Sequence, residues 1–539
     1  MKYYTFDCGC KFKLLDDNED KEIPSIDFSL SLEDLNLDCK KTWDLISSGN
    51  TKGCFQLESR LGRSMAKKLR PENIEQLSAL ISIMRPGCLE AMRDNKSVSN
   101  HFIDKKNGQE SIDYFDPCLE SVLKPTYGEM IYQEQAMEIA RIIAGFDLQE
   151  ADVLRKAIGK KKVDLMAEVK KSFLKGAKKT AVTSIEHATD IFGWIEKSQR
   201  YSFNKSHAIS YAYNAYLSAY SKAHFPKIFF ASYLKYAKDK IDPQQEVREL
   251  VQNATEMNIK ITVPDLLLMN QNFCISNEKI YFGLTDIKNV GLSVYKKLVK
   301  LNEDYPIKNL CWTQCLFMIL DNITSTAAKA LISCGALDIY NKSRTYMLFE
   351  YEMISELTKK EKEYICGIDL EDFDLLGILN ILLKKPRLNV NRKAIINNLI
   401  SSIENPPYSL DDKIEWMCDT ESDLLGINLT YCKLDSYNIS NVNTQCRDLK
   451  GLQPGAKVMM AAEIESFNIV KIKKGPNKGN DMCFVTATDS TGCCDSVIFF
   501  TEQLTLYRNE LLEGNIVIIQ GKTSKNGGLV VDKIYKPRG

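Results

Sequence analysis

Hydrophobic residues recur with a helical period through the first half of the chain. Asn73 to Met84 is amphipathic, Gln133 to Ala144 has a period of about 3.6, and Leu148 to Leu174 is a long basic tract of helical character. Glycine and proline interrupt this region at only a few places, such as Arg85 to Gly87. The pattern predicts a mainly helical domain over residues 41–240.

The pattern changes after residue 240. The stretch FCISNEKIYFGL predicts a short strand pair, and helices are expected at GLSVYKKLVKL and STAAKALISCGAL, all within a region over 241–345. Clusters of charged and amide side chains, such as TKKEKEY and NVNRKAIINNL, then predict a looser helical linker over 346–450. At the opposite end, residues 1–40 read as a short, partly ordered arm.

The last segment, residues 451–539, has the alternation of a β structure. Its β-branched runs are separated by Gly, Asn and Lys turns: AKVMMAAEIESFNIV, DMCFVTATDS, CCDSVIFF, NIVIIQGKT and GLVVDKIY. Five short strands in this length are typical of a small barrel of the OB type. The predicted fold class is therefore multidomain, mainly α-helical, with a small all-β barrel at the end.

Composition adds few constraints. The 539 residues allow roughly three to four domains. Lys and Arg together number 71, as do Asp and Glu, so net charge does not indicate a polyanionic partner and local charge must be considered instead. No signal peptide and no apolar run long enough for a membrane helix are evident, and we expect no membrane partner. We expect a cytoplasmic protein.

The 17 cysteines show no repeated spacing, which indicates reduced and mostly buried thiols. Cys8 and Cys10 have the spacing of half a metal site. A full zinc site needs a second pair nearby, and no further cysteine follows before Cys39. We therefore predict no metal site in this chain. Whether Cys8 and Cys10 bind a metal stays open.

The strongest local charge lies in RKAIGKKKVDLMAEVKKSFLKGAKK, which begins at Arg155. Ten of its residues are basic and two are acidic. A solvated helix face explains most such runs. A single sign of charge, however, is unfavourable unless an anion offsets it, and Gly159 is expected to break the helix and expose backbone amides to a phosphate. Both interpretations stay open on the residues alone.

The stretch YSFNKSHAISY begins at Tyr201 and places several polar side chains in succession at the head of an alanine- and tyrosine-rich run. Asn204 or Ser206 is expected to cap the following helix, which would leave Lys205 and His207 as further polar groups. The positive end of the helix dipole would then favour a triphosphate or a nucleic-acid backbone. The tyrosines of this run share one helix face and mostly predict core packing, with base stacking as the alternative for one or two of them: Tyr213, Tyr216 and Tyr220.

Two further stretches suit nucleic acid. FGLTDIKNVGLSVYKKLVK reads as a helix, a tight turn at IKNVG and a second helix, a hairpin that presents backbone N–H groups to phosphates. The first loop of the predicted barrel, KIKKGPNKGN, supplies four lysines to a possible single-strand surface.

Five motifs occur in the order in which they resemble the fingers domain of bacterial replicative DNA polymerase III alpha subunits: TKGCFQLESR at Thr51 to Arg60, MRPGCLE at Met84 to Glu90, YGEMIYQEQAMEIA at Tyr127 to Ala140, EADVLRKAIGKKK at Glu150 to Lys162 and YSFNKSHAISYA at Tyr201 to Ala212. FGLTDIKNVG is similar to the helix-hairpin-helix of that family, ALISCGALD matches a further stretch, and the barrel is similar to its OB domain. The resemblance covers residues 35–536 and is weakest over 346–450.

The resemblance implies template-directed addition of deoxynucleotides, with primer-template DNA and a dNTP as partners. It implies nucleotide or phosphate contacts for the following residues: Arg155, Lys156, Lys160, Lys161, Lys162, Asn204, Lys205, Ser206 and His207. It implies DNA contacts for a second set: Arg85, Lys288, Asn289, Gly291, Lys471, Lys473, Lys474 and Lys478.

The family's palm, with its three catalytic aspartates, and its thumb have no counterpart in this sequence. Asp27 is the nearest candidate for the third aspartate, and its surroundings do not match. No catalytic residue is identified, and Mg²⁺ is expected at the palm of a partner chain. The family's sliding-clamp peptide has a partial counterpart that keeps two apolar residues but lacks the glutamine: Asp374, Leu375 and Leu376.

Two hypotheses follow. In the first, the chain is the carboxy-terminal part of a split replicative polymerase of a phage or similar replicon, inactive alone, and a palm- and thumb-bearing polypeptide completes it. The start at Met1 with a distinct arm favours this interpretation. In the second, the chain is a non-catalytic DNA-binding or clamp-associated factor derived from a polymerase. Retention of both RKAIGKKK and FNKSH favours the enzyme.

Overall fold

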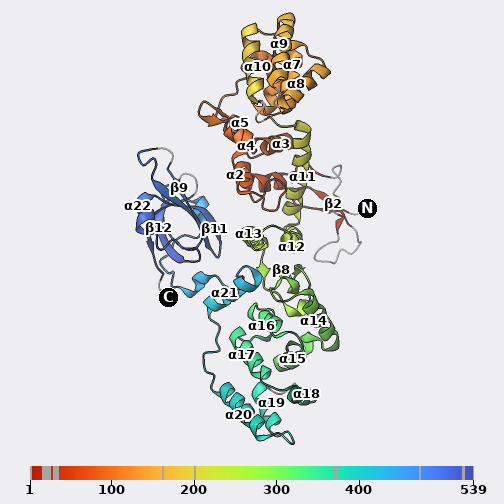
Figure 1. The fold of residues 1–539 in the computed structure, drawn as a ribbon, viewed down its shortest axis with the longest axis vertical. Coiled ribbons are helices and arrows are strands. Elements are labelled where there is room, and N and C mark those ends of the chain that lie inside the picture. Colours follow the sequence, from red (N-terminus) through yellow and green to blue (C-terminus); the bar gives the residue numbers. More distant parts are fainter. Residues whose placement is uncertain are drawn as a thin grey trace. The chain divides into compact units, whose positions relative to one another are not determined.

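A computed structural model of the chain describes residues 3–14, 26–27, 35–160, 163–198, 202–368, 374–472, 475–524 and 528–537. The chain divides into two compact units, Met1–Pro226 and Lys227–Gly539, and Figure 1 shows the elements of both. None of the helices in these ranges is long and apolar enough to cross a membrane.

The first unit is mainly helical. Its helices are α1 (Lys40–Ser48), α2 (Arg60–Leu69), α3 (Ile74–Ile83), α4 (Pro86–Glu90), α5 (Val98–Lys106), α6 (Glu120–Leu123), α7 (Gln133–Ala144), α8 (Leu148–Lys160), α9 (Val163–Thr180), α10 (Ile185–Ser198) and α11 (Lys205–His224). Short strands form a three-stranded sheet from β1 (Tyr3–Thr5), β2 (Lys11–Leu14) and β3 (Ile26–Asp27), and a pair from β4 (Met92–Arg93) and β5 (Lys96–Ser97).

Two groups of helices build this unit. Helices α7 to α10 enclose their own core, in which the ring centroids of Phe173 and Phe192 lie 5.0 Å apart. Helix α11 packs against α3 and α1, and the ring of Tyr216 lies 4.7 Å from that of Trp43. Tyr216 and Tyr220 are both buried, which confirms the prediction that these tyrosines form a core face.

The second unit begins with α12 (Pro226–Ala237) and contains a larger helical array, followed by the barrel. The array has α13 (Pro243–Glu256), α14 (Leu292–Asp304), α15 (Trp312–Met318), α16 (Ser325–Ser333), α17 (Arg344–Ser355), α18 (Lys359–Cys366), α19 (Leu375–Leu383), α20 (Val390–Glu404) and α21 (Ile414–Leu425). A small sheet pairs β6 (Ile261–Thr262), β8 (Lys279–Tyr281) and β7 (Cys274–Ser276) in that order, and β7 and β8 form the expected strand pair.

The region over 346–450 is not loose where the structure describes it. Buried residues of α17 to α21, such as Met347 and Leu399, belong to the same hydrophobic core as those of α12 to α16. Arg344, at the start of α17, has 1% of its side chain exposed and donates to Glu421 of α21, with an Nη1–Oε1 distance of 2.7 Å. A buried ion pair and apolar side chains therefore join the helices of this region, and the charged and amide clusters belong to these packed helices.

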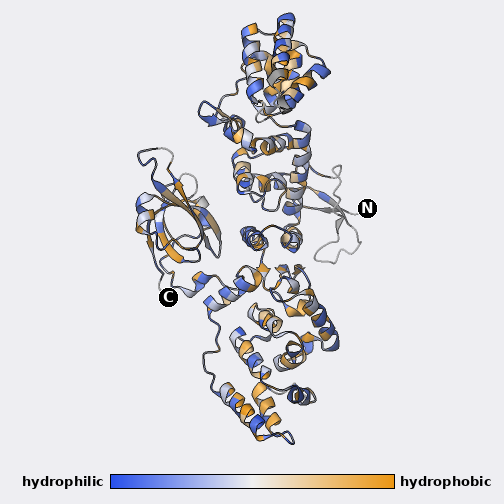
Figure 2. Ribbon diagram, viewed as in Figure 1, coloured by the Kyte–Doolittle hydropathy of each residue, from blue (hydrophilic) through white to orange (hydrophobic). Residues whose placement is uncertain are grey.

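The barrel is closed by five strands in the order β10-β11-β13-β12-β9: β9 (Lys457–Lys471), β10 (Asp481–Asp489), β11 (Gly492–Phe499), β12 (Ile516–Thr523) and β13 (Leu529–Tyr535). Strands β11 and β13 pair in parallel, and the other neighbours are antiparallel. Helix α22 (Thr501–Leu506) lies between β11 and β12 in the chain. Figure 2 shows apolar and polar segments alternating along these strands. The predicted five-stranded barrel is confirmed.

One local prediction is wrong. The basic tract was expected to break at Gly159, but α8 runs through this glycine and ends at Lys160. A glycine inside a helix costs only about 1 kcal/mol relative to alanine, and packing of Leu154 and Ala157 in the helical core outweighs that cost. The predicted domain boundaries at residues 40, 240, 345 and 450 stay predictions.

Candidate nucleotide and nucleic-acid interface

The first turn of α11 begins with a well-defined cap. Asn204 has extended backbone angles, and its side-chain oxygen accepts from the backbone N–H of His207 at 2.8 Å. The preceding residue, Phe203, donates its N–H to Ile131 and accepts from the N–H of Gln133, each at 2.9 Å. Because of this bridge, the amino-terminal ends of α7 and α11 lie beside each other.

Glu134 occupies the junction of the two helices. Its carboxylate accepts from the Asn204 side-chain amide and from the Lys205 backbone N–H, both at 2.9 Å. The Ser206 hydroxyl donates to the Asn204 side-chain oxygen at 2.7 Å. Both polar side-chain atoms of Asn204 therefore form hydrogen bonds within the protein. Ser206 and His207 are exposed, and Lys205 is partly exposed.

Cations flank this turn. The guanidinium of Arg85 lies 3.8 Å from the ring centroid of Phe203. The Lys205 ammonium lies 5.8 Å from the ring centroid of Tyr132 and 3.7 Å from a carboxylate oxygen of Glu75. Arg85 is exposed, so its guanidinium keeps a solvent face. The carboxylates of Glu75 and Glu134 offset part of the positive charge of the helix dipole and of these two cations, so an anion would be favoured chiefly beside Arg85.

Aromatic rings continue the surface along α11. The ring of His207 lies 4.1 Å from that of Tyr211 and 5.5 Å from that of Phe203. Tyr213, the third tyrosine of the predicted face, is only partly buried. The exposed imidazole of His207 therefore lies between two aromatic rings at the surface.

The basic tract on α8 is a separate feature. Arg155 and Lys156 both bind Asp152 of the same helix, at 2.8 Å and 2.7 Å. The side chain of Lys160, and Lys161 and Lys162 entirely, lie outside the described residues. Among the residues that are described, no hydrogen bond or ion pair connects this helix to the start of α11. Geometry thus brings Arg85 to the Asn204–His207 turn and does not bring Arg155 or Lys156 there.

The predicted hairpin lies in the second unit. Its first limb is a short 3₁₀ turn, η4 (Leu284–Asp286), and the second is α14. The apolar side chains of the turn, Ile287 and Val290, are buried, whereas Lys288, Asn289 and Gly291 are exposed. Asn289 has a φ of 75°, in the left-handed region. No side chain caps α14 at Gly291, so its first backbone N–H groups face solvent.

Asp286, the last residue of η4, gives a stability prediction. Burial raises the pKa of its carboxyl to about 6, against a partial opposing effect of Lys238. The folded pKa exceeds the unfolded value of about 3.9, so the folded form holds the proton more tightly, and stability falls as pH rises from about 4 to 6. Asp286→Asn should therefore stabilise the second unit by about 2 kcal/mol at pH 8 and by little at pH 3.5.

Urea unfolding of wild type and Asp286→Asn at these two pH values measures the difference. Asp304→Asn, at the end of α14, is a matched control that should show no such pH-dependent gain. An equal effect of Asp286→Asn at both pH values would contradict the burial argument.

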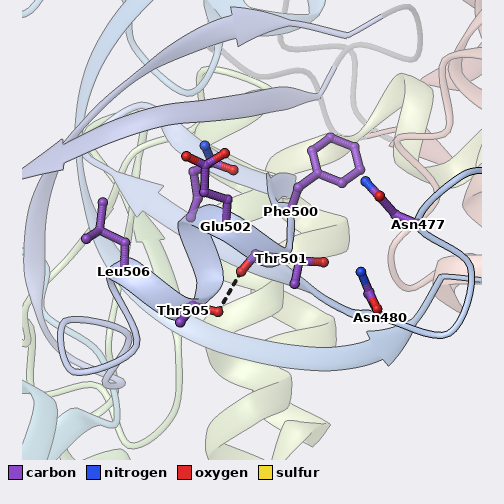
Figure 3. A pocket seen from close by; sticks show the side chains of 8 residues that line it. Asn477, Asn480, Phe500, Thr501, Glu502, Thr505 and Leu506 are labelled. Atoms are coloured by element: carbon purple, nitrogen blue, oxygen red, sulfur yellow. Dashed lines mark hydrogen bonds between the residues drawn. The ribbon is translucent and has the colours of Figure 1, made fainter.

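The barrel carries an open groove of about 630 Å³. Figure 3 shows Asn477 and Asn480, from the loop after β9, facing Phe500 and the first turn of α22. The Phe500 side chain is 41% exposed, and a base can stack on such a ring. Lys471 and Lys478 are exposed beside this loop, whereas Lys473 and Lys474 lie outside the described residues.

The segment with a possible clamp-binding role, Asp374 to Leu376, forms the start of helix α19. The side chain of Asp374 caps α19 by accepting from the N–H of Gly377 at 2.8 Å. Leu375 is buried, with 1% exposed, and Leu376 is partly buried. Binding to a clamp through both leucines would require the start of α19 to unwind.

Within the ranges given above, the clustered metal-ligand side chains are Cys8, Cys10, Cys39 and His224, and no cluster of carboxylates occurs. The isolated Cys8–Cys10 pair was the sequence signal for this group. Cys39 and His224 were not linked to it, because His224 is 185 residues from Cys39 in the chain.

Comparison with known proteins matches this architecture. The model of the bacterial DNA polymerase III alpha subunit finger domain matches residues 12–181, and that of a helix-hairpin-helix motif matches residues 258–347. DNA polymerase III subunits alpha of Buchnera aphidicola (from Schizaphis graminum) and Aquifex aeolicus are 32% and 31% identical over 92% and 94% of this chain. That of Pseudomonas aeruginosa is 29% identical over 93% of it.

The matched parts are 41%, 39% and 42% of those three relatives, so the chain spans about two fifths of their length. The finger-domain match includes the four motifs between Thr51 and Lys162, and the second match includes FGLTDIKNVG, whereas YSFNKSHAISYA lies beyond residue 181. The chain therefore carries the finger domain of bacterial DNA polymerase III alpha subunits and a helix-hairpin-helix motif, and it is similar to such subunits over most of its length.

Proposed function

We propose that this chain positions an incoming dNTP and primer-template DNA during template-directed DNA synthesis. The observation that carries the proposal is the first turn of α11, where Arg85, Lys205 and His207 surround the positive end of a helix dipole. Preorganised cations and donors of this kind stabilise the charge that develops on a transferring phosphoryl group. The relatives, named as polymerase subunits, give the chemistry its class.

The catalytic carboxylates come from outside these 539 residues, on a palm- and thumb-bearing polypeptide that we propose is a separate chain. The lack of a carboxylate cluster in the described ranges supports this division. Mg²⁺ would be held by that palm, and this chain would supply positioning and charge. The chain alone would then bind DNA without extending a primer, in the cytoplasm of a bacterium or of a phage-infected host.

The two basic features divide the work on the fingers side. Lys205, Ser206 and His207 contact the triphosphate, and Asn204 holds their turn in place through Glu134. Arg155 and Lys156 lie on α8, away from this turn, and their shared partner Asp152 neutralises part of their charge. We assign them, with the lysines that follow, to the template backbone or to the outer phosphates.

The second unit holds DNA without reading bases. Exposed Lys288 and Asn289 and the open N–H groups at Gly291 suit one phosphate of a duplex. In the barrel, Lys471 and Lys478 flank a groove in which Phe500 provides a stacking surface for single-stranded template. Glu502 in the same groove repels phosphate, so a base rather than the backbone is expected there.

Gly291 gives a prediction for DNA binding. A Cβ added there meets no atom within 4 Å, and its φ is not in the left-handed region. Gly291→Ala should therefore fold normally but crowd the phosphate, and we expect roughly 10-fold weaker duplex binding, about the loss of one charge-assisted hydrogen bond. Fluorescence anisotropy at fixed salt measures the affinity of each variant for duplex DNA.

Gly283, eight residues earlier, is the matched control. Its added Cβ would lie 2.4 Å from the Asn272 Cα and the Gln271 carbonyl oxygen, so Gly283→Ala should lower stability instead. Wild-type affinity in a folded Gly291→Ala variant would remove this glycine from the DNA surface.

Primer extension tests the split-enzyme proposal directly. The purified chain is assayed alone. Each candidate palm-bearing protein from the same genome is assayed alone and then together with the chain. We expect no extension by either part alone and extension by the pair. Extension by this chain alone would overturn the division of the active site.

A second function is a non-catalytic DNA-binding or clamp-associated factor. The exposed hairpin favours it, because DNA contact there needs no nucleotide. Tight DNA binding with no partner that restores synthesis would favour this alternative. A sliding-clamp contact through Asp374, Leu375 and Leu376 is compatible with either function. Because Leu375 is buried, this contact has weaker support than the proposed DNA contacts.

A further inference from the structure

Three cysteines and a histidine converge in the first unit, far from the α11 turn described above. They come from the turn between β1 and β2, from the residue before α1, and from the last residue of α11: Cys8, Cys10, Cys39 and His224. Their three sulfur atoms and one ring nitrogen all lie within 4.8 Å of one another. Figure 1 shows β2 beside α11, where these segments meet.

The distances approach those of a tetrahedral zinc site. The Nε2 of His224 lies 3.4 Å from the Sγ of Cys39 and 3.9 Å from that of Cys8. With Zn–S of about 2.3 Å and Zn–N of about 2.0 Å, neighbouring ligands on a tetrahedron are separated by about 3.5–3.8 Å. The widest pair in the cluster would need to contract by only about 1 Å.

Local structure aims each ligand at this point. A turn brings Cys8 and Cys10 together: the Phe6 N–H donates to the Cys10 carbonyl at 2.9 Å, and Gly9 has a φ of 82°, which favours glycine. Cys39 stands at the amino-terminal cap of α1, where no side chain bonds the helix, and its sulfur lies 3.4 Å from the Nε2 of His224.

The surroundings support ligation rather than simple packing. Cys10, Cys39 and His224 are each 5% exposed or less, and the Asn36 amide donates to the Cys10 sulfur at 3.4 Å. An N–H donor to a sulfur ligand is the outer contact that orients and stabilises metal thiolates. Rings of Phe6 and Tyr220 lie 5.0 Å and 4.3 Å from that of His224 and fix its plane.

We propose that Cys8, Cys10, Cys39 and His224 bind one structural Zn²⁺. Four protein ligands leave no open position, so the ion has no catalytic role. Binding releases the three thiol protons to solvent and leaves the Zn(S)₃N centre with a charge of about −1. The ion links the turn between β1 and β2 to the start of α1 and to the end of α11. The proposal does not depend on the polymerase function.

Metal analysis of the full-length chain tests it. Protein purified without chelator from zinc-supplemented cells should contain about one zinc per chain by plasma mass spectrometry. Cys39→Ser and His224→Ala should each lower this to about 0.2 or less. Cys54→Ser, a fully buried cysteine of the same unit outside the cluster, is the matched control and should keep the ion.

Cobalt gives a readout on the wild-type chain that does not rely on any variant folding. Co²⁺ added to the metal-free chain should give intense visible bands of tetrahedral thiolate coordination, which Zn²⁺ then abolishes. Wild-type protein without zinc that also lacks these bands, or a disulfide between any two of the three cysteines in place of the metal, would overturn the proposal.

Discussion

Glu421→Gln should destabilise the second unit by about 3 kcal/mol, because the buried guanidinium of Arg344 loses its buried carboxylate and keeps the more exposed one, that of Asp338. Both side chains of the Arg344–Glu421 pair are 1% exposed or less. Glu421 also accepts from the backbone N–H groups of Leu429 and Thr430 at 2.6 Å and 3.0 Å, so the change disturbs a network that closes α21 onto α17. Urea unfolding monitored by circular dichroism measures the loss.

Glu352→Gln is the matched control for this prediction. Glu352 binds Lys329 at 2.7 Å, the same distance as in the buried pair, but both side chains are nearly half exposed. An exposed pair of this kind contributes about 1 kcal/mol or less. Equal effects of the two substitutions would show that burial of Arg344 does not set the strength of the network.

Removing both candidate triphosphate contacts, in Lys205→Ala/His207→Ala, should lower kcat/KM for dNTP by about 10- to 100-fold in the reconstituted polymerase. Hydrogen bonds to charged groups contribute about 1.5–3 kcal/mol each, and part of that is recovered by water at an exposed site. Asn204 keeps its cap and its bond to Glu134 in this variant, so the helix turn itself is expected to persist.

Two comparisons isolate the nucleotide effect. Duplex affinity should stay within about two-fold of wild type, since the duplex contacts that we propose for the hairpin lie in a different unit. Lys124→Ala, at a lysine with 72% of its side chain exposed and an ion pair to Glu120 at 3.7 Å, controls for loss of one positive charge in the same unit. An unchanged dNTP dependence in the double variant would remove the α11 turn from the nucleotide site.

Elements with strong local signals could be predicted from the sequence. The period of Gln133 to Ala144 gave helix α7 with the same ends, and five β-branched runs gave the five barrel strands. The cap of α11 was also predicted, at Asn204 or Ser206, since such side chains satisfy free backbone N–H groups, and the structure places it at Asn204. In each case neighbours along the chain determine the structure.

Features made by distant residues were missed. Nothing near Asn204 in the sequence indicates that Glu134 takes up its amide, because this contact depends on the bridge between Phe203 and Tyr132. Charge and amide clusters suggested a loose linker around α18 and α20, whereas Arg392 of α20 binds Glu361 of α18 at 2.7 Å and joins them. Periodicity describes which face of a helix is apolar but not which distant face covers it.

The packing of α11 has a consequence for synthesis on the ribosome. Tyr216 packs on Trp43 and donates its hydroxyl hydrogen to the Asn36 carbonyl, so residues near the start of the unit are covered by its last helix. Helices α7 to α10, in contrast, make their core from neighbours in sequence and can form as soon as they emerge. The first 70 residues expose apolar side chains until α11 has left the exit tunnel, which makes nascent chains halted before α11 natural clients for a chaperone.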